Sequence, residues 1–306
     1  MPMEAERAQL VRTECERVKQ YLAALPAEAW TAPSACALWE VRDVVAHLIV
    51  ASSVYIDSIS RGLQDDYSTL EGRPDPSAFR HFRLDQRHLM TTAFGQRALA
   101  LRQDQGEDLV ARFGDAWDHF RELLAQVGSQ DWDKPCYHPW GLMSVRAVMN
   151  TSIFELAIHG WDIYSVREPS VHLSSEALPV VMAHLADCQH WFFTPDEKLA
   201  EPLRYRFALT GALSGQWDIE VEGDRAHMAP STTTIPANTT FGCDGETFAL
   251  MMCGRLGLDA AIGDGRITPT GDLAGVETFK HWFRGAGGGD PATGTRRPTS
   301  EMTAPS

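Results

Sequence analysis

Two acid–base side chains in the segment 154–162 could bind a metal ion. Glu155 and His159 are four residues apart, so a helix places both on one face, one turn apart. Their neighbours Ile153, Leu156 and Ile158 are apolar, which puts the pair at the edge of a core-facing stripe. Burying a carboxylate and an imidazole there costs free energy unless something compensates, and a divalent cation is one such compensation.

A third candidate ligand, His47, lies on the inner stripe of another predicted helix. Helical bundles build metal sites from side chains on facing helices. His47, Glu155 and His159 together offer two nitrogen donors and one oxygen donor, a set that suits zinc and leaves one position open for water or substrate. Two aspartates could orient these ligands by hydrogen-bonding to the side of the ring that faces away from the metal. They are Asp43, one turn before His47, and Asp162, three residues after His159.

The same residues also have interpretations without a metal. Glu155 and His159 could belong to a surface or interhelical ion pair, and His47 could be a hydrogen-bonded core residue. Two other groups are rivals, and we expect both to serve packing: His184 with Cys188 and His190, and Cys136 with His138. Cys36, just before the His47 helix, could reach the same cavity, but a buried structural cysteine is the simpler interpretation.

The first two-thirds of the chain has the periodicity of helices. Apolar residues recur at helical spacing over about 3–25, 41–61, 77–101, 105–127 and 144–166, and a further helix follows residues 174–176 and runs to about 193. Residues 27–40 and 129–141 are aromatic-rich and predicted to be packed loops, and 62–85 is a long polar excursion. Long helices joined by loops indicate an antiparallel bundle.

The pattern changes near Pro195. Residues 203–210 and 217–221 alternate as strands, Gly223-Asp224 is a hairpin signal, and 232–242 fits one or two more strands. Short amphipathic helices are predicted over 246–255 and 273–284, with a turn-rich link to a short strand between them. We expect an α+β domain over 195–284 and a disordered tail over 285–306.

Composition limits the possible functions. The 306 residues carry 27 Lys and Arg against 41 Asp and Glu, a formal net charge of −14, which argues against nucleic acid and against a polybasic membrane patch. The six cysteines are scattered without a CxxC pair, and the apolar run at 44–56 is too short to span a bilayer. The start lacks the apolar core of a signal peptide, so the simplest expectation is a soluble protein of the reducing cytoplasm.

Two motifs resemble those of a known family. The segment Trp39-Glu-Val-Arg-Asp-Val-Val-Ala-His-Leu is similar to the GWTVRDLVAHL segment of the mycothiol-dependent maleylpyruvate isomerase family, and residues 155–162 resemble its E-x-x-x-H-x-x-D signature. The resemblance implies a DinB-like antiparallel four-helix bundle over 1–194 followed by a sterol-carrier-like α+β domain over 195–284. This chain departs from the family in lacking the Gly and Thr that flank the first tryptophan, which changes the start of the helix.

The resemblance also implies roles for particular residues. The family's metal triad falls on His47, Glu155 and His159, with a divalent metal, expected to be Zn²⁺, as cofactor. The arginine that holds the substrate's acid group matches Arg97 best, with Arg87 and Arg102 as rivals. Mycothiol would be the cosubstrate or cofactor, activated as its thiolate at the metal.

Three functions follow from this comparison. The altered first motif and the excursion at 62–85 favour S-transfer from mycothiol to an electrophilic small molecule. The alternatives are a mycothiol-dependent cis–trans isomerase of a maleylpyruvate-like diacid and a non-enzymatic protein that binds a ligand in its second domain. The apolar residues of 203–283 are about enough for a core and leave little room for a lipid tunnel. The expected partners are therefore a small thiol and its substrate, and a monomer is the simplest oligomeric state.

Overall fold

The computed structural model describes residues 2–36, 39–68, 108–138, 141–189, 192–193 and 199–283. The chain divides into two compact units, Met1–Val180 and Val181–Ser306, which we describe one at a time. The predicted domain boundary at 194/195, the predicted tail at 285–306 and most of the predicted helix at 77–101 and the excursion at 62–85 lie outside the described residues. The boundary and the tail therefore stay predictions.

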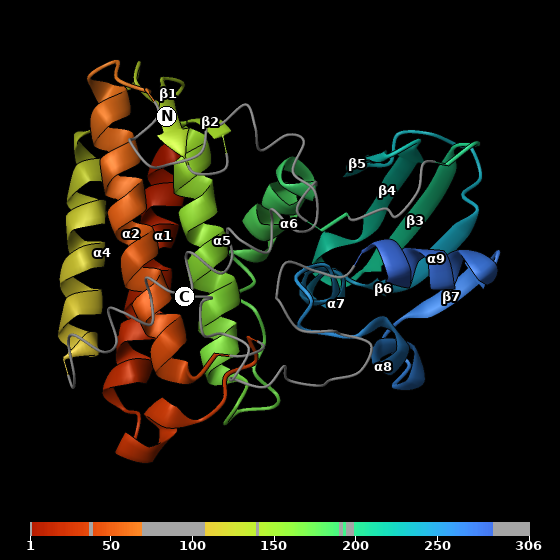
Figure 1. Ribbon diagram of the computed structural model, residues 1–306, viewed down its shortest axis with the longest axis horizontal. Coiled ribbons are helices and arrows are strands. Elements are labelled where there is room, and N and C mark those ends of the chain that lie inside the picture. The colour runs from red at the N-terminus through yellow and green to blue at the C-terminus, as the bar shows by residue number, and fades with distance from the viewer. Residues whose placement is uncertain are drawn as a thin grey trace, which may run out of the picture. The chain divides into compact units, whose positions relative to one another are not determined.

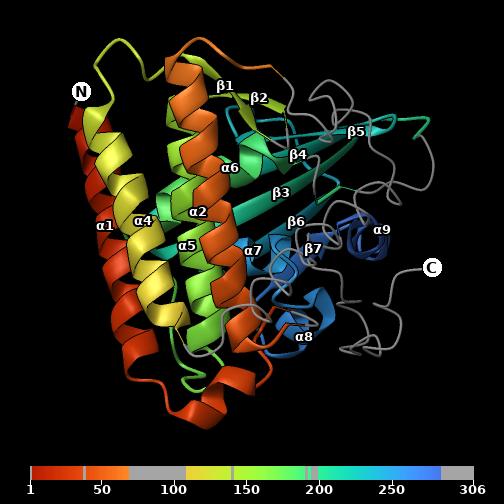
Figure 2. The same ribbon diagram turned by 60° about the vertical axis from the view of Figure 1, so that its left-hand side comes forward.

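Four long helices make up the first unit (Figure 1). They are α1 (Pro2–Ala23), α2 (Val41–Leu63), α4 (Leu109–Gln126) and α5 (Val145–Tyr164). Helices α1 and α2 each pack against both α4 and α5, which closes a four-helix bundle, and Figure 2 shows the same arrangement from another side. These helices confirm the predicted periodicity.

Apolar stripes of the four helices meet in the bundle core. Helix α2 contributes its predicted inner side, including Val44, Val45 and Leu48, all with 0% exposure. Helix α4 contributes large aromatic side chains such as Trp117 and Phe120, which are 1% and 0% exposed. Burial of this apolar surface is the main source of the bundle's stability, because helix propensity alone contributes little.

A β-hairpin replaces the loop that we expected over 129–141. Strands β1 (Pro135–His138) and β2 (Gly141–Ser144) pair antiparallel, with Pro135 opposite Ser144. The prediction was wrong because β1 buries three consecutive residues and so lacks the alternation that marks a strand. Helix α2 contacts this hairpin at Gly62, where an added Cβ would lie 2.6 Å from Cys136 Cβ.

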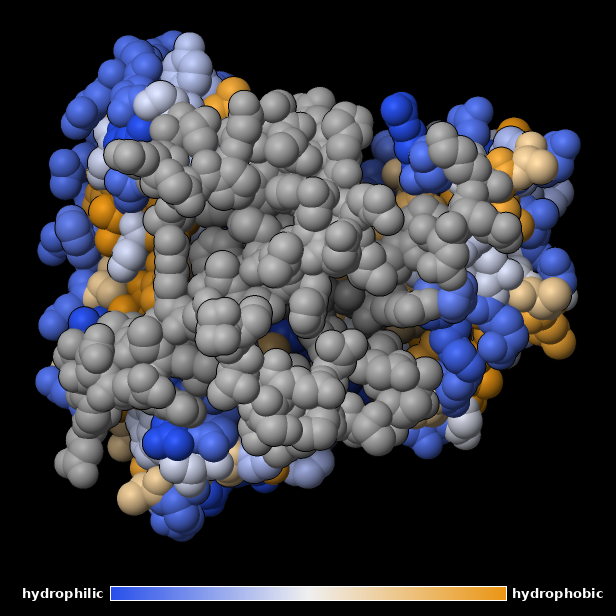
Figure 3. Space-filling view, viewed as in Figure 1, coloured by the Kyte–Doolittle hydropathy of each residue, from blue (hydrophilic) through white to orange (hydrophobic). Residues whose placement is uncertain are grey.

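The apolar run at 44–56 lies within helix α2. Among the described helices, α2 is the one that is long and apolar enough to cross a membrane. However, 67% of its most apolar window is buried inside the structure. That burial is typical of a core helix, so α2 does not indicate a membrane protein. At the outer edge of the helical unit, hydrophilic side chains predominate (Figure 3). All six cysteines are buried, and none forms a disulfide.

A five-stranded sheet forms the second unit. Its strands are β3 (Leu203–Thr210), β4 (Gly215–Glu222), β5 (Arg225–Pro230), β6 (Thr239–Asp244) and β7 (Thr268–Gly271), in the order β5-β4-β3-β6-β7. Strands β3 and β6 are parallel, and the other pairs are antiparallel. The remaining described helices are α6 (Leu178–Asp187), which begins in the first unit, α7 (Gly245–Met252), α8 (Leu258–Gly263) and α9 (Ala274–Trp282), with two short 3-10 helices, η1 (Ala27–Thr31) in the first unit and η4 (Gly211–Leu213) in the second. Helix α8 was not predicted; its last two residues, 262–263, fall in the segment 262–267 that was interpreted as a turn-rich link.

Stacked aromatic rings form the core of this unit. Phe207 lies 4.4 Å from Phe248 and 5.0 Å from Phe241 between ring centroids, and Phe279 lies 5.2 Å from Phe241. These rings are 0–1% exposed. They pack against one another as a core, as the composition of 203–283 predicted.

Candidate metal centre

His47 is positioned by the start of α2 and the connection before it. The Glu40 N–H donates to the Asp43 carboxylate over 2.9 Å, which completes half of a capping box at the helix N-terminus. The first helical residues are thereby fixed, and His47 follows one turn after Asp43. The start of the helix is therefore capped although the usual threonine is absent.

Glu155 and His159 are positioned by α5. The helix starts at Ser144, whose side chain accepts a hydrogen bond from the Ala147 N–H over 3.1 Å. Leu156 and Ile158 are 0% and 2% exposed, so the predicted apolar stripe is buried and fixes the rotation of the helix. Glu155 and His159 consequently face α2.

The three predicted ligands come together at one carboxylate oxygen. His47 Nε2 lies 2.9 Å from Glu155 Oε2, and His159 Nε2 lies 3.1 Å from the same atom. The candidate ligand atoms of all three residues lie within 4.8 Å of one another. Their side chains are 11–18% exposed, so the cluster is nearly buried but open to a small ligand. Two imidazole nitrogens and a carboxylate oxygen at this spacing fit one tetrahedral zinc ion with an open position.

The charges of the cluster stabilise one another. Burial alone would raise the pKa of Glu155, but hydrogen bonds and charge from His159 and His47 outweigh it and hold the pKa well below its usual value. Burial alone would lower the pKa of His159, but hydrogen bonds to Asp162 and Glu155 outweigh it and raise the pKa to about 9. A buried carboxylate is thus kept ionised between two imidazoles, which is the charge state that a cation requires.

Of the two aspartates expected to support the ligands, one contacts a ligand ring. Asp162 is 0% exposed, and its Oδ2 lies 2.8 Å from His159 Nδ1. A carboxylate on Nδ1 fixes the ring so that Nε2 is directed at the Glu155 oxygen. The Asp43 carboxylate instead accepts the hydrogen bond that caps α2.

Cys36 borders the site from the connection before α2. Its sulfur belongs to a second cluster with His159 and Asp162, whose candidate ligand atoms lie within 4.8 Å of one another, and Cys36 is 7% exposed. Cys36 therefore lies beside one of the candidate ligands, His159. Its burial agrees with a structural thiol.

Trp39 is a site residue that sequence reasoning missed. Its ring centroid lies 5.0 Å from that of His47 and 6.0 Å from that of His159, and the two imidazoles are 4.7 Å apart. A signal was present in the sequence, because Trp39 stands eight residues before His47 and opens the same motif.

The rival groups do not gather into a comparable site among the described residues. His184 and Cys188 belong to neither donor cluster, and His190 lies outside the described residues. Burial raises the pKa of Cys136 to about 12, so its thiol stays protonated beside His138. Arg97, with its rivals Arg87 and Arg102, also lies outside the described residues, so its role stays a prediction.

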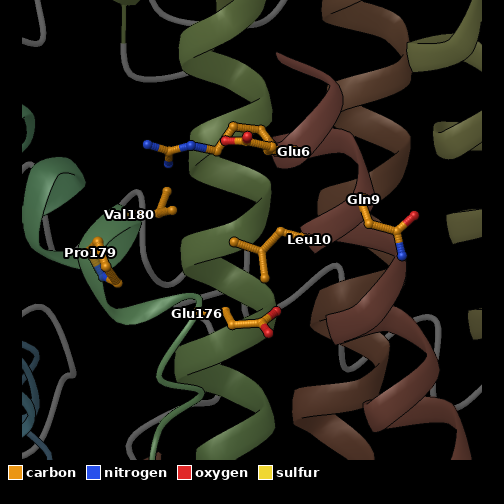
Figure 4. A pocket seen from close by; sticks show the side chains of 7 residues that line it. Glu6, Gln9, Leu10, Glu176, Pro179 and Val180 are labelled. Carbon is orange, nitrogen blue, oxygen red and sulfur yellow. The ribbon is translucent and has the colours of Figure 1, made fainter. Parts of the chain in front are cut away.

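A shallow pocket on the first unit lies away from these ligands. Figure 4 shows side chains of α1, of Glu176 before α6 and of the first turn of α6 around it. Its lining residues are Glu6, Arg7, Gln9, Leu10, Glu176, Pro179 and Val180. None of them belongs to the metal-ligand cluster.

Comparisons with known proteins agree with the motifs. The family model of the mycothiol maleylpyruvate isomerase N-terminal domain matches residues 11–164, slightly more than half of the chain. Two solved structures, the mycothiol-dependent maleylpyruvate isomerase and a histidine-to-alanine mutant of it, each align with a TM-score of 0.60 and 11% identity over 87% of this chain and 92% of theirs. At this identity the likeness shows the fold, and it confirms the predicted class of a helical domain followed by an α+β domain. Among curated proteins, no sequence matches.

Proposed function

Since this chain belongs to the mycothiol maleylpyruvate isomerase N-terminal domain family, we propose that it is a mycothiol-dependent enzyme whose metal ligands are His47, Glu155 and His159. The observation that carries the proposal is the convergence of both Nε2 atoms on one Glu155 oxygen. The relatives of known structure are mycothiol-dependent isomerases, so isomerisation is the first reaction to test. A soluble, cytoplasmic enzyme acting on a small molecule fits the six cysteines, none of which forms a disulfide.

The ligand residues and their supports would prepare the site for a thiol. A divalent cation bound there supplies a Lewis acid that favours the thiolate form of a bound thiol, which is the reactive form. His47 and His159 would offer Nε2 to the cation once those nitrogens have released their protons, Glu155 adds a negative charge, and Asp162 holds the proton on His159 Nδ1. The apolar residues around α5 keep bulk water away, which strengthens these interactions.

In the proposed isomerisation, mycothiol acts as a catalyst. Its thiolate adds to the double bond of a cis enone diacid and forms a C–S bond. Rotation about the resulting single bond follows. Elimination then breaks the C–S bond and gives the trans isomer with the thiol regenerated. Arg97 is the proposed partner for the substrate's acid group.

S-transfer is the second candidate. The specific observation in its favour is the altered start of the first motif, where Glu40 stands in place of the family's usual capping threonine. In that reaction the thiolate displaces a leaving group and the C–S bond stays in the product. A role limited to ligand binding by the second unit is less well supported, because the aromatic rings there pack tightly against one another.

One incubation separates these functions. Zinc-loaded protein is mixed with mycothiol and maleylpyruvate, and in parallel with electrophiles that carry leaving groups; products are followed by NMR and mass spectrometry. An isomer of unchanged mass that requires mycothiol supports the isomerase. An S-conjugate would assign the transferase instead. Zinc-loaded, folded protein that changes none of these substrates would contradict both.

A further inference from the structure

The described part of the connection 32–40 is held in one shape by backbone and hydroxyl hydrogen bonds. The Ser34 N–H and hydroxyl both donate to the Trp39 carbonyl over 2.8 Å, and the Trp39 N–H donates to the Cys36 carbonyl over 3.1 Å. The Ala35 N–H donates to the Asp162 carbonyl over 3.0 Å, which fastens this connection to α5. The position of Trp39 relative to the ligand helices is therefore fixed.

The Trp39 indole lies beside both candidate ligand rings. It is tilted by 52° against His47 and by only 23° against His159, so it is nearly parallel to the second imidazole. Both imidazoles direct Nε2 at Glu155 Oε2. The indole thus contacts both rings whose Nε2 atoms converge on Glu155.

The exposure of Trp39 sets it apart from the tryptophans of the bundle core. Trp117 is 1% exposed and packs on Tyr55 and Phe120, whereas Trp39 is only partly buried. An indole that served only packing would gain more from complete burial. A fixed, partly buried ring beside ligands is suited to contacting a molecule that enters the site.

We infer that Trp39 forms the wall against which the thiol binds, with its indole in contact with the sulfur and its neighbouring carbon. Sulfur and aromatic rings attract one another at a separation of about 5 Å. The ring also displaces water from that side, which leaves the thiolate less solvated and more nucleophilic. This inference rests on the proposed function and assigns a specificity-determining residue to it.

Three variants test the inference. Trp39→Phe keeps an aromatic face, Trp39→Ala removes it, and Trp132→Phe is the matched control. Trp132 lies in the same unit and is 8% exposed, and no described ring contact links it to His47 or His159. The zinc content should equal that of the wild type in all three, because no metal ligand changes.

The first readout needs no turnover. Co²⁺ quenches the fluorescence of nearby tryptophans, so loading the wild type should quench emission, Trp39→Phe should lose most of that quenching, and Trp132→Phe should keep it. Equal quenching in Trp39→Phe and the wild type would overturn the placement of the indole beside the metal. This arm remains informative even if the wild type proves inactive with mycothiol.

The second readout compares the change in the KM for mycothiol with the change in kcat. In Trp39→Ala the KM for mycothiol should rise about two- to tenfold with a smaller change in kcat, and Trp39→Phe should stay near the wild type. An unchanged KM in a folded, zinc-loaded Trp39→Ala would overturn the contact with the thiol. A wild type that ignores mycothiol altogether would instead sink the proposed function, so the two failures are distinguishable.

Discussion

At the scale of single residues, the unusual feature is one buried carboxylate shared by two imidazoles. Glu155 Oε2 accepts both contacts, and the low exposure of the cluster makes each of them strong. Burying a carboxylate costs free energy unless its charge is compensated. Here both imidazole Nε2 atoms compensate it at the same oxygen, Glu155 Oε2. A cation at that point would replace both contacts with shorter bonds to the same atoms.

Asp162→Asn should weaken metal binding about 10–100-fold, because the variant loses the charge that holds His159 Nδ1 in its protonated, oriented form. Competition with a chromophoric chelator measures the affinity. Asp43→Asn is the matched control: it acts on the helix cap, costs about 1 kcal/mol of stability and leaves the metal affinity unchanged. Equal losses of affinity in the two variants would show that Asp162 has no special role.

At the scale of elements, the start of α2 and its end serve different purposes. The start is capped and fastened so that His47 and Trp39 are held in place. The end lies against the β1–β2 hairpin at Gly62, where no side chain fits: an added Cβ would lie 2.6 Å from Cys136 Cβ and 2.8 Å from the Pro135 carbonyl oxygen. This close approach explains a glycine inside a long apolar helix.

Gly62→Ala should destabilise the protein by about 1–3 kcal/mol, because the methyl group forces the hairpin away from α2. Urea denaturation measures the change. Gly263→Ala in α8 is the control, since its Cβ would meet no atom within 4 Å. We expect it to be neutral or stabilising by about 0.5 kcal/mol. A Gly62→Ala protein as stable as the wild type would mean that the hairpin packs more loosely than the structure shows.

At the scale of the whole molecule, each of the two units has its own core, and the candidate metal ligands His47, Glu155 and His159 belong to the first. The second unit holds a charged network on its sheet instead. Arg206 contacts Asp218 Oδ1 over 2.7 Å and Oδ2 over 2.8 Å, and Arg204 and Ser231 contact Oδ2 as well. Its stability should therefore respond to acid independently of the metal site.

Burial alone would raise the pKa of Asp218, but hydrogen bonds from Arg206, Ser231 and Arg204 outweigh it and hold the pKa below 3.8. A depressed pKa in the folded state contributes stability above pH 3.8, and this contribution is lost as the pH falls through the folded value. Asp218→Asn should thus be less stable by about 3 kcal/mol at pH 7 and should change less between pH 5 and 3.

Thermal unfolding at several pH values checks this prediction, and elemental analysis should find unchanged zinc in Asp218→Asn. Parallel stability–pH curves for variant and wild type would contradict the role of Asp218. A loss of zinc would contradict the independence of the two units.

The sequence predicted which residues gather at the candidate site because helical spacing is a local property. His47, Glu155 and His159 could each be assigned to an inner helix face, and the family motifs supplied the pairing between helices that spacing cannot give. The contact of Trp39 with the two imidazoles depends on hydrogen bonds made by Ser34 and Ala35, which no periodicity reveals. The hairpin at β1–β2 escaped prediction because three neighbouring residues are buried by tertiary contacts.

The most direct test of the account is the zinc content of purified wild type and His47→Ala, measured by elemental analysis after equilibration with zinc and removal of excess metal. The account predicts about one zinc ion per wild-type chain and almost none in His47→Ala, since two remaining ligands bind too weakly to retain the ion. Circular dichroism confirms that the variant is folded. Full stoichiometric zinc in folded His47→Ala would contradict the assignment of the site.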